Sequence, residues 1–485
     1  MLTELRIQNF KSWADTGRMR MAPLTAFFGP NSSGKTSILQ LLLLLKQTVE
    51  STDRAEVLHL GDERSYVDLG TFGDILHKQG APEAMAWSLT WTGGEVRDSQ
   101  AAPAQDGPSS LSFSARISGA GEPIAGRPMV DCFRYDLVAD SPIFRFAMRR
   151  LGNNYSRYEF ASTGWELQRP KGRPPFVSPP VKCYGFPPDV LAYDPDTHLL
   201  SAVQLQFERL FGRVYYLGPL RELPGRQSIR GGSRPSDVGR RGERVVDALL
   251  AGAGEQATIS RGKGKKRRSL EEVVAGWLKE LRLACGFRVR PVAEGSNLYR
   301  VYVQRDRGGP EVLLSDVGFG VSQILPVITL CYYVPEGSII ILEQPEIHLH
   351  PVVQAGLADV LIDATKTRNV QIIVESHSEH LLRRLQRRIA EEKVPASDVA
   401  LYFCSMSGNG VSALTTLHLD EYGNISNWPK GSSATRWANW WRRWRRRLPG
   451  GWLPLGNDRR CRGYQRPRRG EWRVVPCERP VWGRR

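Results

Sequence analysis

Hydrophobic and polar positions near the N-terminus predict two strands followed by a helix. Residues 2–10 ("LTELRIQNF") alternate apolar and polar side chains, as a half-buried strand does. Residues 23–29 ("PLTAFFG") form a short apolar run that is typical of a second strand. Apolar side chains then recur with a helical period through several turns, at Ile38, Leu39, Leu42, Leu43 and Leu45.

The middle of the chain changes to a pattern that is typical of an antiparallel sheet. Between residues 84 and 165, short strand-like segments are separated by Gly, Pro and Asn. Residues 166–190 are rich in Pro and predict a loop. A helical period over 199–211 then leads into the strand "RVYYLG" at 213–218.

Towards the C-terminus, helical patterns alternate with apolar strands. Polar, basic loops are expected at 226–243 and 260–269. Ser269 followed by Glu272 is a capping-box pattern that predicts the start of a helix over 270–283. The elements expected after it are strands 287–293 and 299–305, helix 318–334, strand 338–343, helix 352–366, strand 370–377, helix 378–393 and a strand pair at 399–404 and 413–418.

These patterns divide the chain into five expected parts. The first and fourth would form one α/β domain, the second is a β-rich insertion and the third is a lobe of helices and basic loops. The fifth is a basic tail, rich in Trp and Arg. The ranges are 1–83, 84–190, 191–310, 311–430 and 431–485.

Composition narrows the class of protein. No apolar run reaches the ~18 residues of a membrane helix, so no membrane partner is expected. The N-terminus lacks the layout of a signal peptide. The 7 Cys residues are scattered and form no Cys-x-x-Cys pair, which argues against a disulfide framework or a zinc site. We therefore expect a cytoplasmic protein with reduced cysteines.

The net charge of +17 is concentrated in the tail. Residues 431–485 hold 16 Arg, no Lys and 3 acidic residues, and the +13 of the tail leaves +4 for residues 1–430. Three explanations compete: an arm that binds nucleic acid or a membrane surface, a segment that orders on a partner, and the product of a frameshift in a GC-rich gene. We favour the frameshift because no hydrophobic period survives beyond Trp444.

A phosphate-binding motif lies between the second predicted strand and the helix. "GPNSSGKT" fits G-x-x-x-x-G-K-[ST], in which backbone N–H groups and the helix N-terminus face phosphate oxygens. Lys35 would reach the β- and γ-phosphates, and the Thr36 hydroxyl would be a ligand of Mg²⁺. The residues expected to bind the nucleotide are Gly29, Pro30, Asn31, Ser32, Ser33, Gly34, Lys35, Thr36 and Ser37.

Two later strands end in polar residues that suit nucleotide hydrolysis. Glu343 ends the apolar strand "SIIILE" and would hold the water shell of Mg²⁺ together with Thr36. Gln344 follows it, and an amide can hydrogen-bond the attacking water but cannot accept its proton. His377 follows the next strand and could sense the γ-phosphate or orient that water. The sequence thus favours ATP binding and slow rather than fast hydrolysis.

The segment "LSDVGFGVSQILPV" is a weaker candidate. Its small residues stand at a helix start, where backbone amides can bind phosphate, although an ordinary capping loop has the same pattern. The candidate residues there are Ser315, Gly318, Gly320, Ser322 and Gln323. His348 and His350 lack further ligands at a suitable spacing, so no metal site is expected from them.

Taken together and in this order, the motifs resemble those of ABC-type AAA ATPases of the RecF/SMC/OLD-like group, in the subgroup with a C-terminal domain of unknown function. The resemblance spans residues 1–430. It implies an α/β P-loop NTPase fold with an antiparallel β insertion and peripheral helices. It also implies ATP and Mg²⁺ as cofactors and a homodimer with ATP at its interface. The segments that carry it are "IQNFKSW", "GPNSSGKT", "YLGPLRELPGR", "LSDVGFGVSQILP", "EQPEIHLHP" and "VESHSEHLL".

The resemblance also assigns roles. Ser315–Gln323 would form a signature segment that touches the partner's γ-phosphate, His350 would lie in the D-loop and His377 would be the switch histidine. Gln344 departs from the catalytic Glu of the wider superfamily, so Glu346 or His377 could act as a weaker base. No Toprim nuclease domain is seen.

The implied function is a slow ATPase that regulates a DNA-related or anti-phage defence effector. The alternative is an ATP-dependent clamp, sensor or DNA-binding module that does not hydrolyse ATP. Basic residues could contact DNA phosphates or could simply be solvated loops. They are Arg221, Arg226, Arg230, Arg240, Arg241 and the loop 261–268.

Overall fold

The computed structural model describes most of the chain up to residue 428. The tail predicted at 431–485 and part of the Pro-rich segment lie outside the described residues. The described ranges are 1–77, 84–92, 110–120, 127–138, 143–152, 156–164, 176–193, 198–254, 258–261, 264 and 266–428.

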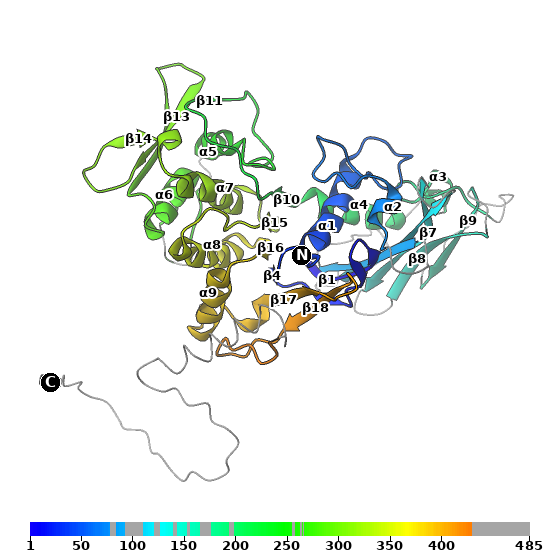
Figure 1. Ribbon diagram of the computed structural model, residues 1–485. Coiled ribbons are helices and arrows are strands. Elements are labelled where there is room, and N and C mark those ends of the chain that lie inside the picture. The colour runs from blue at the N-terminus through cyan, green and yellow to red at the C-terminus, as the bar shows by residue number, and fades with distance from the viewer. Residues whose placement is uncertain are drawn as a thin grey trace, which may run out of the picture. The chain divides into compact units, whose positions relative to one another are not determined.

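Six strands form the sheet that carries the phosphate-binding motif. Most of their side chains are buried, which suits parallel strands that are covered on both faces. The strands are β4 (Leu24–Phe28), β10 (Val214–Leu217), β15 (Ile339–Glu343), β16 (Gln371–Ser376), β17 (Val399–Met406) and β18 (Ser412–Leu417). Their order is β10–β15–β16–β4–β17–β18, and all neighbours are parallel except β17 and β18 (Figure 1).

Helix α1 (Lys35–Glu50) follows the phosphate-binding motif and is apolar on nearly all sides. Residues 41–45 are five consecutive leucines, and each is at most 3% exposed. A helix that is hydrophobic all round must be covered on all sides. Its leucines share one hydrophobic core with Ile341 and Ile373 of the parallel sheet and with Leu89 and Phe113 of a second sheet.

The second sheet is antiparallel and joins the N-terminal strand to the predicted insertion. Leu5 pairs with Leu89 and Ile7 with Trp87, so β1 and β5 are neighbours. The strands are β1 (Leu2–Phe10), β2 (Trp13–Asp15), β3 (Met19–Arg20), β5 (Ala84–Thr92), β6 (Ser110–Ala120), β7 (Arg127–Val138), β8 (Ile143–Arg150) and β9 (Tyr158–Thr163). Their order is β2–β1–β5–β6–β7–β8–β9, with β3 beside β1.

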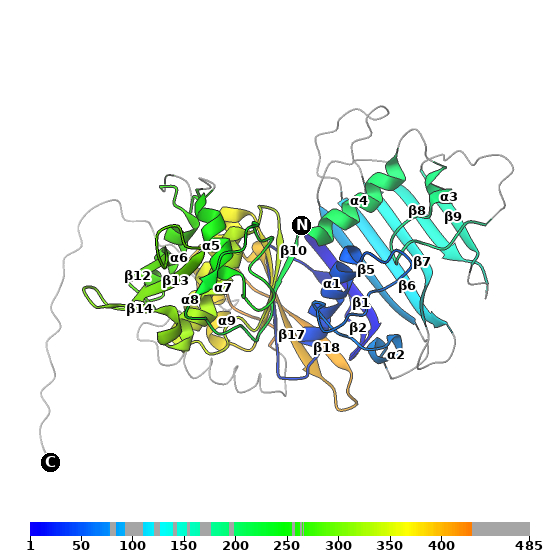
Figure 2. The same cartoon turned by 90° about the horizontal axis from the view of Figure 1, so that it is seen from above.

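Three helices accompany this sheet. Helix α4 (Leu199–Gly212) runs across its strands, as Figure 2 shows. The ring of Phe207 on α4 lies 4.7 Å from the rings of both Phe113 and Tyr184. The short helices are α2 (Phe72–Ile75) and α3 (Pro188–Leu191).

A third, smaller sheet lies beside three helices. The Ser269 capping box forms as predicted, with Glu272 N 3.2 Å from Ser269 Oγ and Ser269 N 2.9 Å from a carboxylate oxygen of Glu272. Helix α5 was not predicted, because residues 244–259, between the two predicted basic loops, were assigned to no element. The elements are β11 (Ser228–Ile229), β12 (Gly286–Pro291), β13 (Leu298–Gln304), β14 (Glu311–Leu313), α5 (Val245–Gly254), α6 (Leu270–Glu280) and α7 (Phe319–Tyr333).

Two further helices, α8 (Pro351–Arg368) and α9 (Glu379–Ala390), follow β15 and β16. With α7 they lie on one side of the parallel sheet, and α1 lies on the other (Figures 1 and 2). Two 3₁₀ turns complete the described elements, at Leu314–Asp316 and Ala396–Asp398. The predicted α/β fold with an antiparallel β insertion is confirmed. Strand β10, from the range expected to form a separate lobe, is the edge strand of the parallel sheet.

Candidate nucleotide-binding site

The phosphate-binding motif forms a tight loop between β4 and α1. Gly29 has φ 148° and Gly34 has φ 87°, both in the region that favours glycine. A Cβ on Gly29 would collide with the carbonyl oxygen of Cys404, and one on Gly34 would collide with the Ser12 and Ser412 hydroxyls. The two glycines are therefore required by this loop geometry, as the motif predicts.

The loop lines a cavity of 390 Å³ at the N-terminus of α1. Seven of the nine residues predicted to bind the nucleotide line this P-loop cavity, and of the nine only Gly29 and Pro30 do not. The cavity therefore lies where a helix N-terminus favours negative charge. Its lining is Ser12, Asn31, Ser32, Ser33, Gly34, Lys35, Thr36, Ser37, Gln344, Glu375 and His377.

Lys35 is held inside the loop. It is 3% exposed, and its ammonium group donates to the carbonyl oxygen of Pro30 at 2.8 Å. Burial lowers the pKa of Lys35, and the negative charge of Glu375, 3.8 Å away, opposes that shift. A cation in this position is suited to contact the terminal phosphates of a nucleotide.

Glu375 lies in this site, although the sequence motifs did not predict a role for it. The Thr36 hydroxyl lies 2.8 Å and 3.0 Å from its two carboxylate oxygens, and Glu375 is 1% exposed. Burial raises the pKa of Glu375, and the bond from Thr36 works against that shift. The sequence did contain a signal, because an acidic residue near the end of the apolar strand "VQIIVESH" needs a partner when it is buried.

Glu343, the predicted metal-binding acid, has a different partner. The hydroxyl of Tyr216 on β10 donates to a carboxylate oxygen of Glu343 at 2.7 Å. Burial raises the pKa of Glu343, and the bond from Tyr216 works against it. The hydroxyl of Thr36 donates to Glu375 and not to Glu343.

Gln344 lies between the two acidic residues. Its φ is 42°, and its backbone N–H donates to the carbonyl oxygen of Glu375 at 2.9 Å. Its side-chain amide also lowers the pKa of the Glu375 carboxylate. An amide at this position therefore favours the charged form of the neighbouring acid.

His377 and Glu346 are linked through the backbone. His377 lines the P-loop cavity, and its N–H donates to a carboxylate oxygen of Glu346 at 2.6 Å. Burial and the charge of Lys35 lower the pKa of His377, so its ring is neutral at neutral pH. Glu346 is 5% exposed and lies behind the strand end, which suits a role in positioning His377.

The signature-like segment, Ser315–Gln323, lies apart from the P-loop cavity. Gly318 caps α7, and the Ser322 hydroxyl donates to the carbonyl oxygen of Phe319 at 2.9 Å. Of the described residues that line the P-loop cavity, none belongs to this segment, so Ser315, Gly318, Gly320, Ser322 and Gln323 do not meet a nucleotide there. His350, the predicted D-loop residue, caps α8 through its ring.

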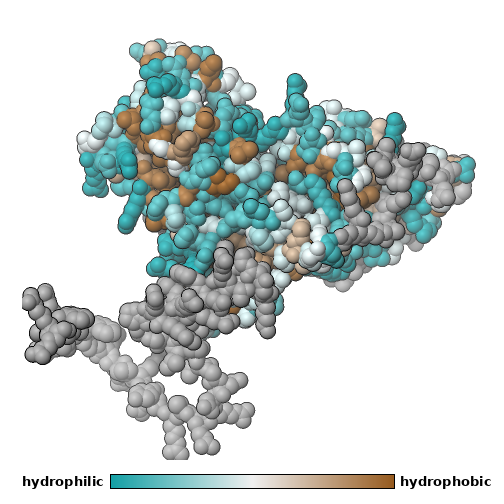
Figure 3. Space-filling model, viewed as in Figure 1, coloured by the Kyte–Doolittle hydropathy of each residue, from teal (hydrophilic) through white to brown (hydrophobic). Residues whose placement is uncertain are grey.

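Exposed apolar side chains lie within and beside the signature-like segment. Leu220 is 72% exposed, Leu223 63% and Phe319 62%. They line a second cavity of 250 Å³ together with Pro219, Arg221, Gln323 and His348. Figure 3 shows apolar surface over the part of the molecule that contains α7 and α8. Such a patch is typical of a surface that another molecule covers.

The basic residues considered for DNA binding differ in their surroundings. Arg221 is only 6% exposed and so belongs to neither a solvated loop nor an open DNA-binding face. Within the described part of the chain its guanidinium nitrogens have no hydrogen-bond partner. Arg226 is paired with Asp316, and Arg240 donates to the carbonyl oxygen of Glu63. Arg230 and Arg241 are exposed.

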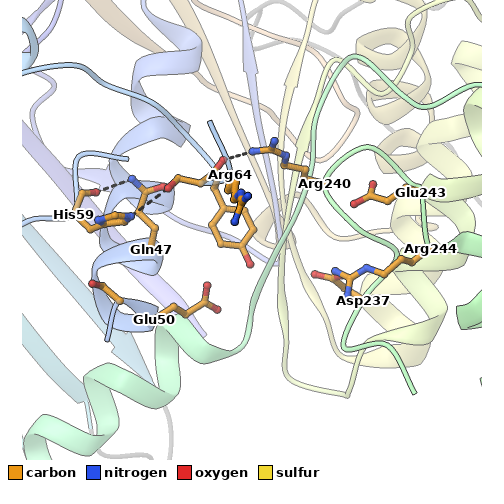
Figure 4. A pocket seen from close by; sticks show the side chains of 11 residues that line it. Gln47, Glu50, His59, Arg64, Asp237, Arg240, Glu243 and Arg244 are labelled. Carbon is orange, nitrogen blue, oxygen red and sulfur yellow. Dashed lines mark hydrogen bonds and ion pairs between the residues drawn. The ribbon is translucent and has the colours of Figure 1, made fainter. Parts of the chain in front are cut away.

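A larger cavity of 580 Å³ lies away from the P-loop, near the C-terminal end of α1 (Figure 4). Most of its polar groups form hydrogen bonds or ion pairs within the protein. Gln47 donates to the carbonyl oxygens of His59 and Val67, and Asp237 is paired with Arg244. These bonds hold loops in place, so volume alone does not identify the functional site.

The donor atoms at the P-loop suit Mg²⁺. Thr36 supplies a hydroxyl, and Glu375 and Glu343 supply carboxylates, which are the oxygen ligands that this ion prefers. Among the described residues, no group of three or more His, Cys, Asp or Glu side chains is arranged to hold a metal ion. A site completed by substrate phosphates is the usual arrangement for Mg²⁺. Fold and site together define a P-loop nucleotide-binding protein.

Family models match three parts of the chain. Residues 1–74 match an "AAA ATPase domain", and residues 205–383 match "AAA domain, putative AbiEii toxin, Type IV TA system". Residues 394–431 match "Protein of unknown function (DUF3696)". The AAA matches contain the P-loop and the two acidic strand ends. These matches confirm the predicted resemblance to AAA ATPases.

Solved structures similar to this chain include heads of SMC proteins. An SMC head bound to the C-winged helix domain of ScpA has 11% identity and a TM-score of 0.41, and the alignment covers 87% of this chain and 98% of that one. The SMC head domain from Thermotoga maritima has 12% identity and a TM-score of 0.39, with coverages of 86% and 99%. Similarity at this level carries no information on function. No curated protein matches the chain.

The described residues include no helix with the length and apolar composition needed to cross a membrane.

Proposed function

We propose that the chain binds ATP with Mg²⁺ at the P-loop cavity and hydrolyses it slowly. The observation that carries this proposal is the arrangement of Lys35, Thr36 and Glu375 at the N-terminus of α1. Backbone amides of the loop and the Lys35 ammonium would bind the phosphates, and Thr36 with a carboxylate from the adjacent strand ends would hold Mg²⁺. When bound, the ion neutralises charge on the phosphate oxygens.

Slow turnover follows from the proton acceptors that the cavity offers. Water attacks the γ-phosphorus, the bond to the bridging oxygen breaks, and ADP and phosphate leave while the water proton goes to a weaker base, Glu346 or His377. Gln344 can orient this water but cannot accept its proton. His377 has a neutral ring next to the cavity and is the group we assign to sense the γ-phosphate. Glu346 positions it through the backbone.

The proposal extends to a homodimer with ATP at its interface. The signature-like segment does not line the P-loop cavity of its own chain, and exposed apolar residues surround it. In a head-to-tail dimer, this surface would meet the nucleotide of the partner. Light scattering with and without ATP tests this, and a protein that stays monomeric with Mg²⁺·ATP would contradict it.

The ATPase would regulate an effector in DNA metabolism or anti-phage defence. The match to a family described as a toxin of a Type IV TA system supports a defence role. Exposed Arg230 and Arg241 support testing DNA as a partner. A DNA affinity that falls steeply with rising salt would support direct phosphate contacts.

Phosphate release by the purified protein tests the enzyme proposal. Slow, Mg²⁺-dependent release that Lys35→Ala abolishes is the expected result. Release that is unchanged in that variant would contradict it. The second candidate function is an ATP-dependent clamp or sensor without turnover, and the presence of Gln344 after Glu343 favours it. Dimerisation on ATP without phosphate release would identify the clamp.

A further inference from the structure

We propose that Glu375, and not Glu343, is the carboxylate that holds Mg²⁺ in the Mg²⁺·ATP complex. This inference rests on the proposed ATP binding and names a residue that the motif pattern does not select. The motif pattern selects Glu343 because it ends the apolar strand that precedes "QPE". The contacts of the described residues favour the acid on the neighbouring strand.

The first observation is the direction of the Thr36 hydroxyl. Thr36 has one hydroxyl hydrogen, and both oxygens within hydrogen-bonding distance belong to Glu375, at 2.8 Å and 3.0 Å. In the P-loop motif this hydroxyl is a Mg²⁺ ligand. A carboxylate in contact with it is therefore next to the position of the ion and can bind the ion's water shell.

The second observation is the strand order. Strand β16 lies between β15 and β4, and Glu375 pairs with Glu343 on one side and with Phe27 on the other. Neighbouring strands are about 4.8 Å apart. The backbone of Glu375 is thus one strand closer to the P-loop than the backbone of Glu343.

The third observation concerns the partners of the two acids. Tyr216 donates to Glu343 from the opposite side of β15, where β10 lies. The backbone N–H of Gln344, in contrast, donates to the carbonyl oxygen of Glu375 at 2.9 Å, and its side-chain amide lowers the pKa of the Glu375 carboxylate. An amide at position 344 therefore suits a neighbouring carboxylate. A carboxylate there would add a third negative charge beside Glu343 and Glu375.

The position of Glu375 next to Lys35 should make ATP binding depend on Mg²⁺. Their charged groups are 3.8 Å apart, so without Mg²⁺ the carboxylate opposes the incoming triphosphate. With Mg²⁺ the same carboxylate attracts the ion. Mg²⁺ should therefore tighten ATP binding, and Glu375 should carry most of this coupling between ion and nucleotide.

The test is the affinity for ATP with MgCl₂ and with EDTA, measured by calorimetry on the full chain. In the wild-type protein Mg²⁺ should tighten binding by about tenfold or more. In Glu375→Gln the ratio should fall to about twofold or less, with Mg²⁺-free binding no weaker than in the wild type. The matched variant Glu343→Gln has the same change on the adjacent strand and should keep a ratio close to that of the wild type.

Each alternative result has a definite meaning. Coupling that is lost in Glu343→Gln and kept in Glu375→Gln would overturn this inference and leave ATP binding intact. Loss of all ATP binding in a folded Glu375→Gln variant would also overturn it. A wild-type protein that binds no ATP would overturn both this inference and the proposed function. Thermal unfolding checks that each variant is folded, and Glu375→Asp, which keeps the charge, should retain more coupling than Glu375→Gln.

Discussion

The hydroxyl of Thr36 lies 2.8 Å from a carboxylate oxygen of Glu375, although 339 positions separate the two residues in the sequence. The parallel sheet brings them together, because β4 and β16 are neighbours and both end at the same edge. The order of the strands in the sheet therefore brings these two residues into one site.

Exchanging the amide and the acid at positions 344 and 375 tests whether they act as a pair. Gln344→Glu alone adds a carboxylate beside Glu375 and should weaken Mg²⁺-free ATP binding by about tenfold or less, with no gain in phosphate release. The double variant Gln344→Glu/Glu375→Gln restores one amide and one acid and should bind ATP better than Gln344→Glu. Calorimetry and phosphate release on the three proteins provide the measurement.

The sequence alone favours the opposite result for Gln344→Glu, because it would restore the catalytic Glu of the wider superfamily. Faster phosphate release in this single variant would support that interpretation and would contradict the pairing seen here. Additive effects of the two substitutions would show that the residues act independently.

Phe319→Asp tests the proposed dimer surface. Phe319 is 62% exposed, and burying a Phe side chain contributes about 1.5–3 kcal/mol. A symmetric interface contains Phe319 twice, so the substitution would reduce the free energy of dimerisation by about 3 kcal/mol or more. This weakens dimerisation by about 100-fold. Light scattering with Mg²⁺·ATP should therefore show a monomer.

The matched control is Tyr422→Asp, because Tyr422 is 65% exposed in the loop after β18. This variant should dimerise as the wild type does. Equal dimerisation of Phe319→Asp and the wild type would exclude this surface as the interface.

Asp359→Asn tests the link between α8 and α9. The carboxylate accepts from Arg384 at 2.7 Å and from Arg388 at 2.5 Å. Burial raises the pKa of Asp359, but the bonds from Arg388 and Arg384 outweigh this and the pKa is lowered. The substitution should reduce the free energy of unfolding by about 1–3 kcal/mol at pH 7.

The difference in the free energy of unfolding between the wild type and Asp359→Asn should become smaller at low pH. A lowered pKa stabilises the fold above the ordinary value of 3.8, and this stability is lost as the pH falls through the lowered pKa. Urea unfolding should therefore show a constant difference between pH 7 and 5 and a smaller one below 3.8. Asp306→Asn, at an exposed loop position, should show almost no difference, and a pH-independent effect of Asp359→Asn would contradict the account.

The sequence predicted the parts of this structure that depend on local pattern. Apolar runs predicted the buried parallel strands. Ser269 and Glu272 predicted the start of α6, and the glycine spacing predicted the loop from Gly29 to Thr36. In each case the residues that determine the element are close together in the chain.

The parts that escaped prediction depend on which strands are neighbours. The contact between Thr36 and Glu375 requires β16 to lie between β15 and β4, and no local pattern contains that order. Tyr216 is likewise placed beside Glu343 only because β10 pairs with β15. The sequence predicted an accessible position for Arg221, because its burial depends on contacts with residues that are far away in the chain.

The most direct test of the central claim is calorimetric binding of Mg²⁺·ATP to the wild-type protein, Lys35→Ala and Lys279→Ala. Lys35 is buried in the P-loop, whereas Lys279 is exposed on α6. Lys35→Ala loses a charge-assisted hydrogen bond of about 1.5–3 kcal/mol, so its affinity for Mg²⁺·ATP should be roughly 10- to 150-fold weaker. The affinity of Lys279→Ala should equal that of the wild type. No binding to the wild type, or equal binding to all three, would contradict a nucleotide site at this loop.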